Sequence, residues 1–464
     1  MTERPKTTFS RRSLMAGGIA LFGAGVALLR PRGAANGGIA APAIASRPIA
    51  GRAIAAPQFL DAVGICTHPN WHKTLWGSVD WQSAFLATGV RHTRGKIGRG
   101  APGRAALGNL QRLFANGVKI CVTVASEDGA FDFESTQASL DFLANNVPAQ
   151  NISGIESANE YNNPRNKPDD WAPRLREFQA WLYKAVKTNP RLGRAPVIGP
   201  SIWGRLTEDY VELGNLQPFL DKACLHYYTG GRRPTRAGKP GRRDEGGGAD
   251  DYSIADAIRE ASVIAPGKPM WITEYGYPVA GPGTPLSGNM ITEMAAAKYL
   301  LRGLFDAFAL GVEKIYIYSL IDDVQRSPPR YHGLLDGTLR PRPAFHAVKN
   351  LMALFADSGQ PFAPAALGYS LGNVPGSIKQ SLFQKSDGTY LLALYQDVDS
   401  YDRRGRRDLD VPPASVALGL TRPASRVEIF TPSTSAGALR SANNVNALAI
   451  PVGDQVTVVK ITPA

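Results

Sequence analysis

The sequence predicts an α/β protein, a (β/α)8 TIM barrel followed by an all-β sandwich domain. Between residues 62 and 319, eight short apolar, β-branched or aromatic runs alternate with segments of helical period. Eight strand–helix units in roughly 250 residues match the size of a closed parallel barrel. From Pro361 onward, short alternating runs are separated by Gly, Pro, Asn and Asp, which is typical of a β-sandwich.

The barrel strands are expected where the apolar runs lie, and the helices where apolar residues recur every three or four positions. The expected strands are 62–67, 89–94, 118–125, 152–160, 196–200, 223–228, 269–275 and 313–319. The expected helices are 105–116, 136–145, 171–188, 254–262, 290–310 and 343–356. An open doubly wound sheet is disfavoured, because residues 66–71 (Cys-Thr-His-Pro-Asn-Trp) stand where a Gly-rich phosphate loop would follow the first strand.

The predicted domains are an export signal over 1–45, a linker over 46–60, the catalytic barrel over 61–358 and the β-sandwich accessory domain over 359–464. The sandwich strands are expected at 378–384, 390–396, 427–431, 448–452 and 455–461. The accessory domain need not contribute catalytic residues.

The N-terminus resembles a twin-arginine export signal. Arg11 and Arg12 precede an apolar stretch over 15–29, and the small residues Ala43 and Ala45 offer a cleavage site. The alternative is a basic surface patch before a buried helix. Export would make the protein periplasmic or secreted, with the twin-arginine translocase as its partner during export and no stable membrane span in the mature form.

The formal net charge of +13 does not predict nucleic-acid binding. Part of the excess lies in the signal and part in the loop 230–251, where no aromatic side chain interleaves the cations to form a stacking platform. That loop is either a solvated segment or a contact for an anionic substrate. Cys66, Cys121 and Cys224 lie in expected strands and indicate buried free thiols. His68 and His72 lack a third ligand at sensible spacing, so we expect no metal and no cofactor.

Two segments, 152–161 and 269–278, each contain a short apolar run that ends in a glutamate, Glu160 in the first and Glu274 in the second. The carboxyl ends of barrel strands form the active face, and two carboxylates are what cleavage of a glycosidic bond requires. Glu156 lies one layer deeper on the same side of its strand, and Arg94 is the best cation to pair with it. That pair is either a core ion pair or part of the site.

These segments resemble a known group of enzymes. Asn159-Glu160 and the run from Trp271 to Gly276 (Trp-Ile-Thr-Glu-Tyr-Gly) look like the paired motifs of glycoside hydrolase clan A, the retaining (β/α)8 enzymes. The spacing Glu156-x-x-Asn159-Glu160 and the β-sandwich are most similar to family 39, which includes β-xylosidases, iduronidases and exopolysaccharide hydrolases. The resemblance implies Glu160 as acid/base and Glu274 as nucleophile.

The resemblance also implies substrate-binding residues. Asn159 would hold the sugar 2-hydroxyl, Arg94 would keep the nucleophile ionised, Tyr228 would hydrogen-bond it and His226 would support the site. The chain departs from the family pattern at Ala158, where tryptophan is usual. It departs again at Tyr161, where proline is usual, and in the eighth strand, which lacks the tryptophan platform.

Aromatic residues at strand ends are further candidates for stacking against sugar rings. Trp71 and Trp203 follow the first and fifth strands, and Tyr318 in the eighth strand stands in for the missing tryptophan. The resulting hypothesis is a retaining hydrolase of β-linked oligo- or polysaccharides. The alternatives are a non-catalytic carbohydrate-binding protein and a transglycosylase that remodels a cell-surface glycan or exopolysaccharide.

Overall fold

The computed structural model describes residues 48–125, 131–165, 167–205, 207–237, 252–357 and 359–464. The twin-arginine segment and its cleavage site lie outside the described residues, as does most of the basic loop, over 238–251. Within the described ranges, no helix combines the length and the apolarity needed to cross a lipid bilayer.

The first sheet is the expected parallel barrel. In the described part of the chain it has eight strands, in the spatial order β7-β6-β5-β4-β3-β10-β9-β8. They are β3 (Val63–Cys66), β4 (His92–Gly95), β5 (Lys119–Ala125), β6 (Ile152–Ala158), β7 (Val197–Ile198), β8 (Ala223–Tyr227), β9 (Met270–Tyr275) and β10 (Lys314–Ile317). A parallel bridge between Ile198 and Lys222 links the two ends of this order. The carboxyl ends of the strands therefore meet at one mouth.

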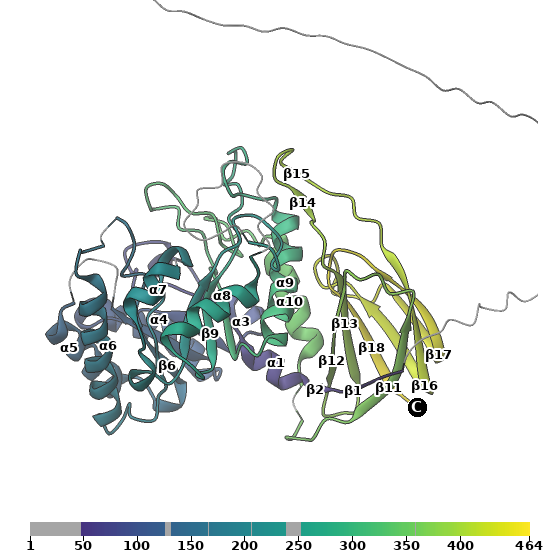
Figure 1. Ribbon diagram of the computed structural model, residues 1–464, viewed down its shortest axis with the longest axis horizontal. Coiled ribbons are helices and arrows are strands. Elements are labelled where there is room, and N and C mark those ends of the chain that lie inside the picture. The colour runs from purple at the N-terminus through teal and green to yellow at the C-terminus, as the bar shows by residue number, and fades with distance from the viewer. Residues whose placement is uncertain (1–47, 126–130, 166, 206, 238–251, 358) are drawn as a thin grey trace, which may run out of the picture. The chain divides into compact units, whose positions relative to one another are not determined.

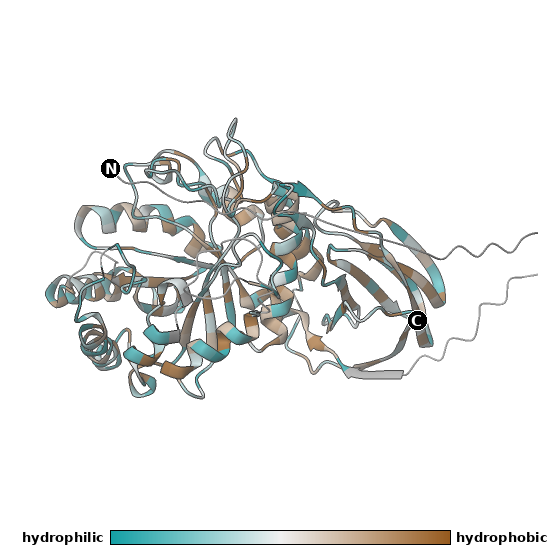
Figure 2. Cartoon of the chain, turned by 45° about the horizontal axis from the view of Figure 1, so that its top comes forward, coloured by the Kyte–Doolittle hydropathy of each residue, from teal (hydrophilic) through white to brown (hydrophobic). Residues whose placement is uncertain are grey.

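The helices cover the barrel with amphipathic faces. They are α1 (Ala56–Ala62), α2 (Leu75–Ser78), α3 (Trp81–Ala87), α4 (Gly100–Ala115), α5 (Phe133–Asn146), α6 (Trp171–Thr188), α7 (Thr207–Leu213), α8 (Ile254–Ala261), α9 (Glu293–Ala309) and α10 (Pro343–Phe355). Helix α6, for example, buries Leu175, Phe178, Leu182 and Val186, which recur every three or four residues. Figure 2 shows apolar residues concentrated on the barrel strands and on the helix surfaces beside them.

The second sheet is mostly antiparallel and forms the β-sandwich domain. Its strands from the C-terminal part of the chain are β11 (Ala366–Gly372), β12 (Ile378–Gln384), β13 (Tyr390–Gln396), β16 (Ala414–Phe430), β17 (Arg440–Val452) and β18 (Thr457–Pro463). The long strand β16 pairs with β11 and β17 in its first half and with β17 and β18 in its second. An apolar core that includes Leu392, Val416, Ile450 and Val459 lies between these strands. The predicted fold class is thus confirmed.

The sequence predicts a linker over 46–60, but the described residues from Pro48 onward are part of the fold. Strand β1 (Pro48–Arg52) pairs antiparallel with β11, and β2 (Ile54–Ala55) pairs parallel with β12, so residues 48–55 join the second sheet. Helix α1 follows at once and buries Phe59 against the barrel helices. The Ala-, Ile- and Pro-rich composition suited an edge strand, where a proline need not donate a ladder hydrogen bond.

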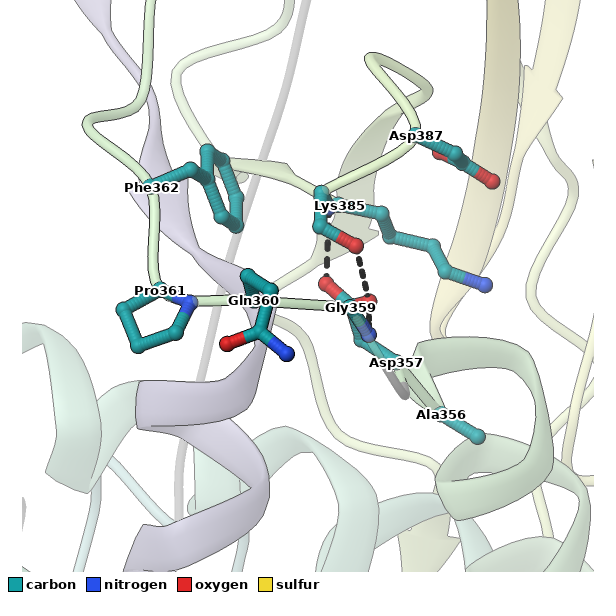
Figure 3. Close-up of a pocket in the computed structure, with 9 residues that line it drawn as sticks. Ala356, Asp357, Gly359, Gln360, Pro361, Phe362, Lys385 and Asp387 are labelled. Atoms are coloured by element: carbon teal, nitrogen blue, oxygen red, sulfur yellow. Dashed lines mark hydrogen bonds between the residues drawn. The ribbon is translucent and has the colours of Figure 1, made fainter.

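Hydrogen bonds between Asp357 and Ser386 connect the end of the last barrel helix to the second sheet. After α10, the carboxylate of Asp357 accepts hydrogen bonds from the backbone N–H and the hydroxyl of Ser386, in the turn between β12 and β13. Figure 3 shows these two bonds beside Phe362 and Lys385, which line the shallow pocket at this junction. The contact sets where the chain leaves the last barrel helix.

Candidate active site

Strands β6 and β9 deliver the two glutamates to the barrel mouth. Strand β6 ends at Ala158, and Glu160 follows with its N–H donating to the Ser201 carbonyl at 3.1 Å. Glu160 has φ 52°, a left-handed conformation that is uncommon for residues other than glycine. Glu274 lies near the end of β9. A carboxylate oxygen of Glu160 lies within 4.8 Å of one of Glu274, so the two side chains face the same space.

Glu274 is held as an anion by its neighbours. Its Oε1 accepts a hydrogen bond from Arg94 Nη1 at 2.7 Å, and its Oε2 accepts one from the Tyr228 hydroxyl at 2.7 Å. Burial by itself would raise the pKa of Glu274, but the charges of His226 and Arg94 and these hydrogen bonds hold it well below its ordinary value. Glu274 is therefore ionised at neutral pH.

Arg94 connects the mouth of the barrel to its interior. Its Nε and Nη2 donate to the two oxygens of Glu156, which is fully buried, and Nη2 also donates to Asn159 Oδ1 at 2.8 Å. Burial would lower the pKa of Arg94, but the carboxylates of Glu156 and Glu274 raise it. The ion pair of Glu156 and Arg94 is thus not isolated in the core, because the same guanidinium also binds Glu274. Glu156 acts on the site through Arg94.

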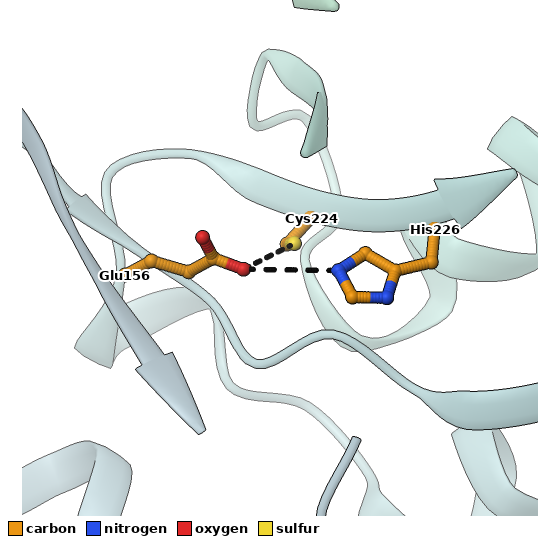
Figure 4. Close-up of side chains that lie close together, drawn as sticks. All are labelled: Glu156, Cys224 and His226. Atoms are coloured by element: carbon orange, nitrogen blue, oxygen red, sulfur yellow. Dashed lines mark hydrogen bonds and ion pairs between the residues drawn. The ribbon is translucent and has the colours of Figure 1, made fainter. Parts of the chain in front are cut away.

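Two side chains of strand β8, Cys224 and His226, also lie close to Glu156. Cys224 Sγ lies 3.6 Å from its Oε1, and His226 Nε2 lies 4.0 Å from the same oxygen (Figure 4). These three residue types can bind a transition metal. Because Arg94 already neutralises Glu156 in a bidentate pair, a cation here would face a like charge, and we assign the cluster to the polar core.

His226 lies between the two mouth carboxylates. Its Nδ1 is 2.9 Å from Glu160 Oε1 and 3.6 Å from Glu274 Oε2. Burial by itself would lower the pKa of His226, but the charges of Glu274 and Glu160 raise it above its ordinary value. The histidine is therefore positioned to orient Glu160 and to hold positive charge beside both carboxylates.

A cavity of about 400 Å³ opens above these groups. Its lining includes Glu160 and Glu274 and two of the expected aromatic residues, Trp71 and Tyr318. The indole of Trp71 stacks on His68 at 3.9 Å between ring centroids, which fixes its orientation. Trp203 does not line this cavity. It lies 38% exposed in a 3₁₀ turn after the short strand β7, and its N–H donates to Asn162 Oδ1.

Several lining residues were not foreseen as site residues. They are Asn70, Lys96, Thr123, Arg326 and Arg330, together with His68, which had been considered only as a metal ligand. Lys96 and Asn70 closely follow strands β4 and β3, so their place after a strand was an available signal. Arg326 and Arg330 lie in an irregular segment with no such signal. The three cysteines are buried free thiols, as expected.

Comparison with known proteins gives a match at the level of the fold. Neither a protein-family model nor a curated protein sequence matches the chain. Among solved structures, a monomeric beta-xylosidase from Caulobacter crescentus CB15 aligns with a TM-score of 0.57 at 14% identity, over 89% of this chain and 98% of that one.

Two further solved structures align similarly. A family 39 glycoside hydrolase from the gut symbiont Bacteroides cellulosilyticus WH2 aligns with a TM-score of 0.56 at 14% identity, over 88% of this chain and 82% of that one. A glucosidase from Croceicoccus marinus aligns with a TM-score of 0.54 at 13% identity, over 91% and 98%. The barrel-plus-sandwich architecture of family 39 is therefore shared over most of the chain.

Proposed function

We propose that the protein is a retaining glycoside hydrolase that cleaves β-glycosidic bonds of an oligo- or polysaccharide by double displacement. The observation that carries the proposal is the placement of Glu160 and Glu274 across one cavity, with carboxylate oxygens within 4.8 Å of each other. Retaining enzymes place their two carboxyl groups about 5–5.5 Å apart, whereas inverting enzymes need about 6.5–9.5 Å to fit a water molecule. The shared fold with family 39 structures supports the same conclusion.

The two glutamates have different surroundings, and this difference supports giving them different roles. Glu274 is kept ionised by Arg94 and Tyr228, which suits the nucleophile that attacks the anomeric carbon. Glu160 contacts the ring of His226 and is about one-fifth exposed toward the cavity. It would protonate the leaving oxygen in the first step and then remove a proton from water in the second. Asn159, fixed by Arg94, would bind the sugar 2-hydroxyl.

Azide rescue tests this division of labour. In Glu160→Ala, an activated aryl β-glycoside should still form the glycosyl-enzyme on Glu274, because its leaving group needs little protonation. Azide should then restore turnover and give the β-azide. In Glu274→Ala, turnover should be abolished, and azide should give only the inverted α-azide. The exposed Glu177→Ala on α6 is the matched control and should behave as wild type.

The product stereochemistry decides the test. Nuclear magnetic resonance of the azide products reports the anomeric configuration directly. Rescue of Glu160→Ala with inversion would show that the two roles are exchanged. Turnover of a broad aryl glycoside panel that is equal in wild type and Glu274→Ala would remove the proposed function.

We further propose export by the twin-arginine route with removal of residues up to about Ser46. The motivation is the Arg11-Arg12 pair and the apolar stretch that follows it. N-terminal sequencing of the protein from periplasm and medium is expected to start near Arg47. Recovery of the intact chain in the membrane fraction would instead assign the stretch as an anchor.

A further inference from the structure

Cationic side chains from several elements line the cavity. Besides Arg94, its lining includes Lys96, Arg326 and Arg330. Arg94 forms ion pairs with Glu156 and Glu274. The three other cations come from two separate loops, after β4 and after β10, so they are not members of one charged run.

The charges of Arg326 and Arg330 act inside the site. Burial, together with the charges of Arg94, Arg326 and Arg330, lowers the pKa of His68 to about 4, although the charge of Glu274 acts in the opposite direction. The same loop contains three acids. Asp322 pairs with Arg342, Asp336 pairs with Arg340, and the carboxylate of Asp323 accepts a hydrogen bond from the backbone of Arg326. Clefts lined by one sign of charge attract ligands of the opposite sign.

The C-terminal domain brings an arginine-rich hairpin to the loops of the barrel mouth. Strands β14 (Tyr401–Asp402) and β15 (Arg407–Asp408) pair as a separate two-stranded sheet, and residues 403–407 of this hairpin include four arginines. Arg406 Nη1 donates to the Leu286 carbonyl at 2.6 Å, and Arg403 donates to Asn289 Oδ1. Figure 1 shows this hairpin beside the loops at the carboxyl ends of the barrel strands.

The loop that receives the hairpin also reaches the cationic loop of the cavity. Leu286 and Asn289 belong to the segment between β9 and α9, and within that segment the N–H of Val279 donates to the Tyr331 carbonyl, next to Arg330. The hairpin is therefore connected, through the segment between β9 and α9, to the loop that carries Arg326 and Arg330. We call this surface, made of Lys96, Arg326, Arg330 and the hairpin 403–407, the cationic rim.

The two aspartates of the hairpin, Asp402 and Asp408, accept hydrogen bonds from neighbouring residues. Asp402 accepts from the N–H groups of Arg404 and Gly405, and Asp408 accepts from the hydroxyl of Thr292. Arg404 is exposed and Arg407 has a side chain that is 74% exposed. These guanidiniums are accessible to a ligand that extends beyond the cavity.

We propose that the substrate is an anionic glycan and that the cationic rim binds its charged groups, with the hairpin of the second domain acting as a binding element outside the cavity. This inference rests on the proposed function for the reaction itself. Guanidinium groups bind carboxylates and sulfates in the same bidentate way, so the shared chemistry is an anionic substituent repeated along a sugar chain. The second domain then takes part in substrate recognition.

Binding to a matched set of polymers tests the inference without any turnover. Dextran, carboxymethyl dextran and dextran sulfate share a backbone and differ in charge, so they separate neutral, carboxylate and sulfate ligands. Affinity electrophoresis at 50 mM and 500 mM sodium chloride is expected to show retardation by one or both charged polymers at low salt only. Dextran is expected to have no effect.

Variants then locate the binding surface. Arg404→Gln/Arg407→Gln in the hairpin should weaken binding of the charged polymer about fivefold, and Arg326→Gln in the cavity should weaken it further. Arg422→Gln/Arg440→Gln is the control, because it removes two exposed arginines from β16 and β17. A thermal melt of each variant verifies folding.

The outcomes divide cleanly. Loss in the hairpin pair but not in the control pair supports the proposal, and the polymer that binds identifies the anion as carboxylate or sulfate. Equal weakening in both pairs would show that net charge alone attracts polyanions, and equal binding of dextran would show that charge is irrelevant; either result overturns the proposal. Because no glycosidic bond is cleaved in this assay, its failure is distinct from failure of the proposed function.

Discussion

Replacing Glu156 by glutamine tests how the buried charge beneath the site supports the barrel. The Glu156 carboxylate is fully buried and accepts two hydrogen bonds from Arg94 and one from Thr273 at 3.0 Å. Glutamine has the same shape but carries no charge. Because Arg94 donates to both carboxylate oxygens, the amide nitrogen of the glutamine would face a guanidinium nitrogen in either orientation, so a donor would meet a donor.

The expected loss follows from what remains around Arg94. Removing one partner of a buried ion pair destabilises a protein by about 3–5 kcal/mol when the other charge is left uncompensated. Here Glu274 still contacts Arg94 Nη1 at 2.7 Å, so the guanidinium retains one anion. We therefore expect a loss near the lower end, about 3 kcal/mol in the free energy of unfolding.

Tryptophan fluorescence during urea unfolding measures this loss in the barrel alone. All seven tryptophans lie between residues 71 and 271, so the signal does not follow the second sheet. The control is Asp170→Asn, which removes an exposed partner of Arg174 and should leave the urea midpoint unchanged. A loss below about 1 kcal/mol for Glu156→Gln would refute the idea that this pair is ionised and structurally required.

Three other changes have expected outcomes. Tyr228→Phe removes a hydrogen bond that favours ionised Glu274, so the acidic limb of the kcat/KM profile should move up by about one pH unit; an unmoved limb would contradict this. Burial raises the pKa of Asp306 to about 6, so its folded form binds a proton more tightly than its unfolded form. The free energy of unfolding of the wild type should therefore fall by up to about 3 kcal/mol as the pH rises from about 4 to 7. Asp306→Asn should abolish this fall in urea titrations. Trp71→Ala should raise KM about tenfold, whereas Trp203→Ala, outside the cavity, should leave KM unchanged.

The elements with clear periodicity could be predicted from the sequence. Helix α6 was expected at 171–188 and strands β12 and β13 at 378–384 and 390–396, and the structure has these bounds. Strand β16 was expected only over 427–431 because Thr421, Arg422 and Pro423 interrupt the alternation. In the structure the register of its pairing with β17 shifts at this point, and the strand continues on both sides.

The site residues divide in the same way. Glu160, Glu274 and Arg94 lie at or just after the carboxyl ends of regular strands, and their place at the mouth follows from strand direction. Trp203 was misplaced because β7 has only two residues, so the position of a side chain five residues later is set by the turn. The place of Arg326 in the cavity could not be predicted from the sequence, because the segment after β10 has neither helical nor strand periodicity.

The contacts between the two sheets argue that the second domain is more than an appended module. Phe59 of α1 stacks on Phe305 of α9 at 4.6 Å and contacts Phe383 of β12 at 5.3 Å, so one aromatic cluster is built from both parts of the chain. Beside it, the fully buried Arg302 donates to the carboxylate of Asp397 at 2.9 Å, and Asp397 also accepts from the hydroxyl of Thr235. Thr235 belongs to the loop after β8, which also carries part of the basic run. Replacement of Asp397 would thus leave a buried guanidinium without its anion and release a loop of the barrel mouth, which links the stability of the domain junction to the position of the loop after β8.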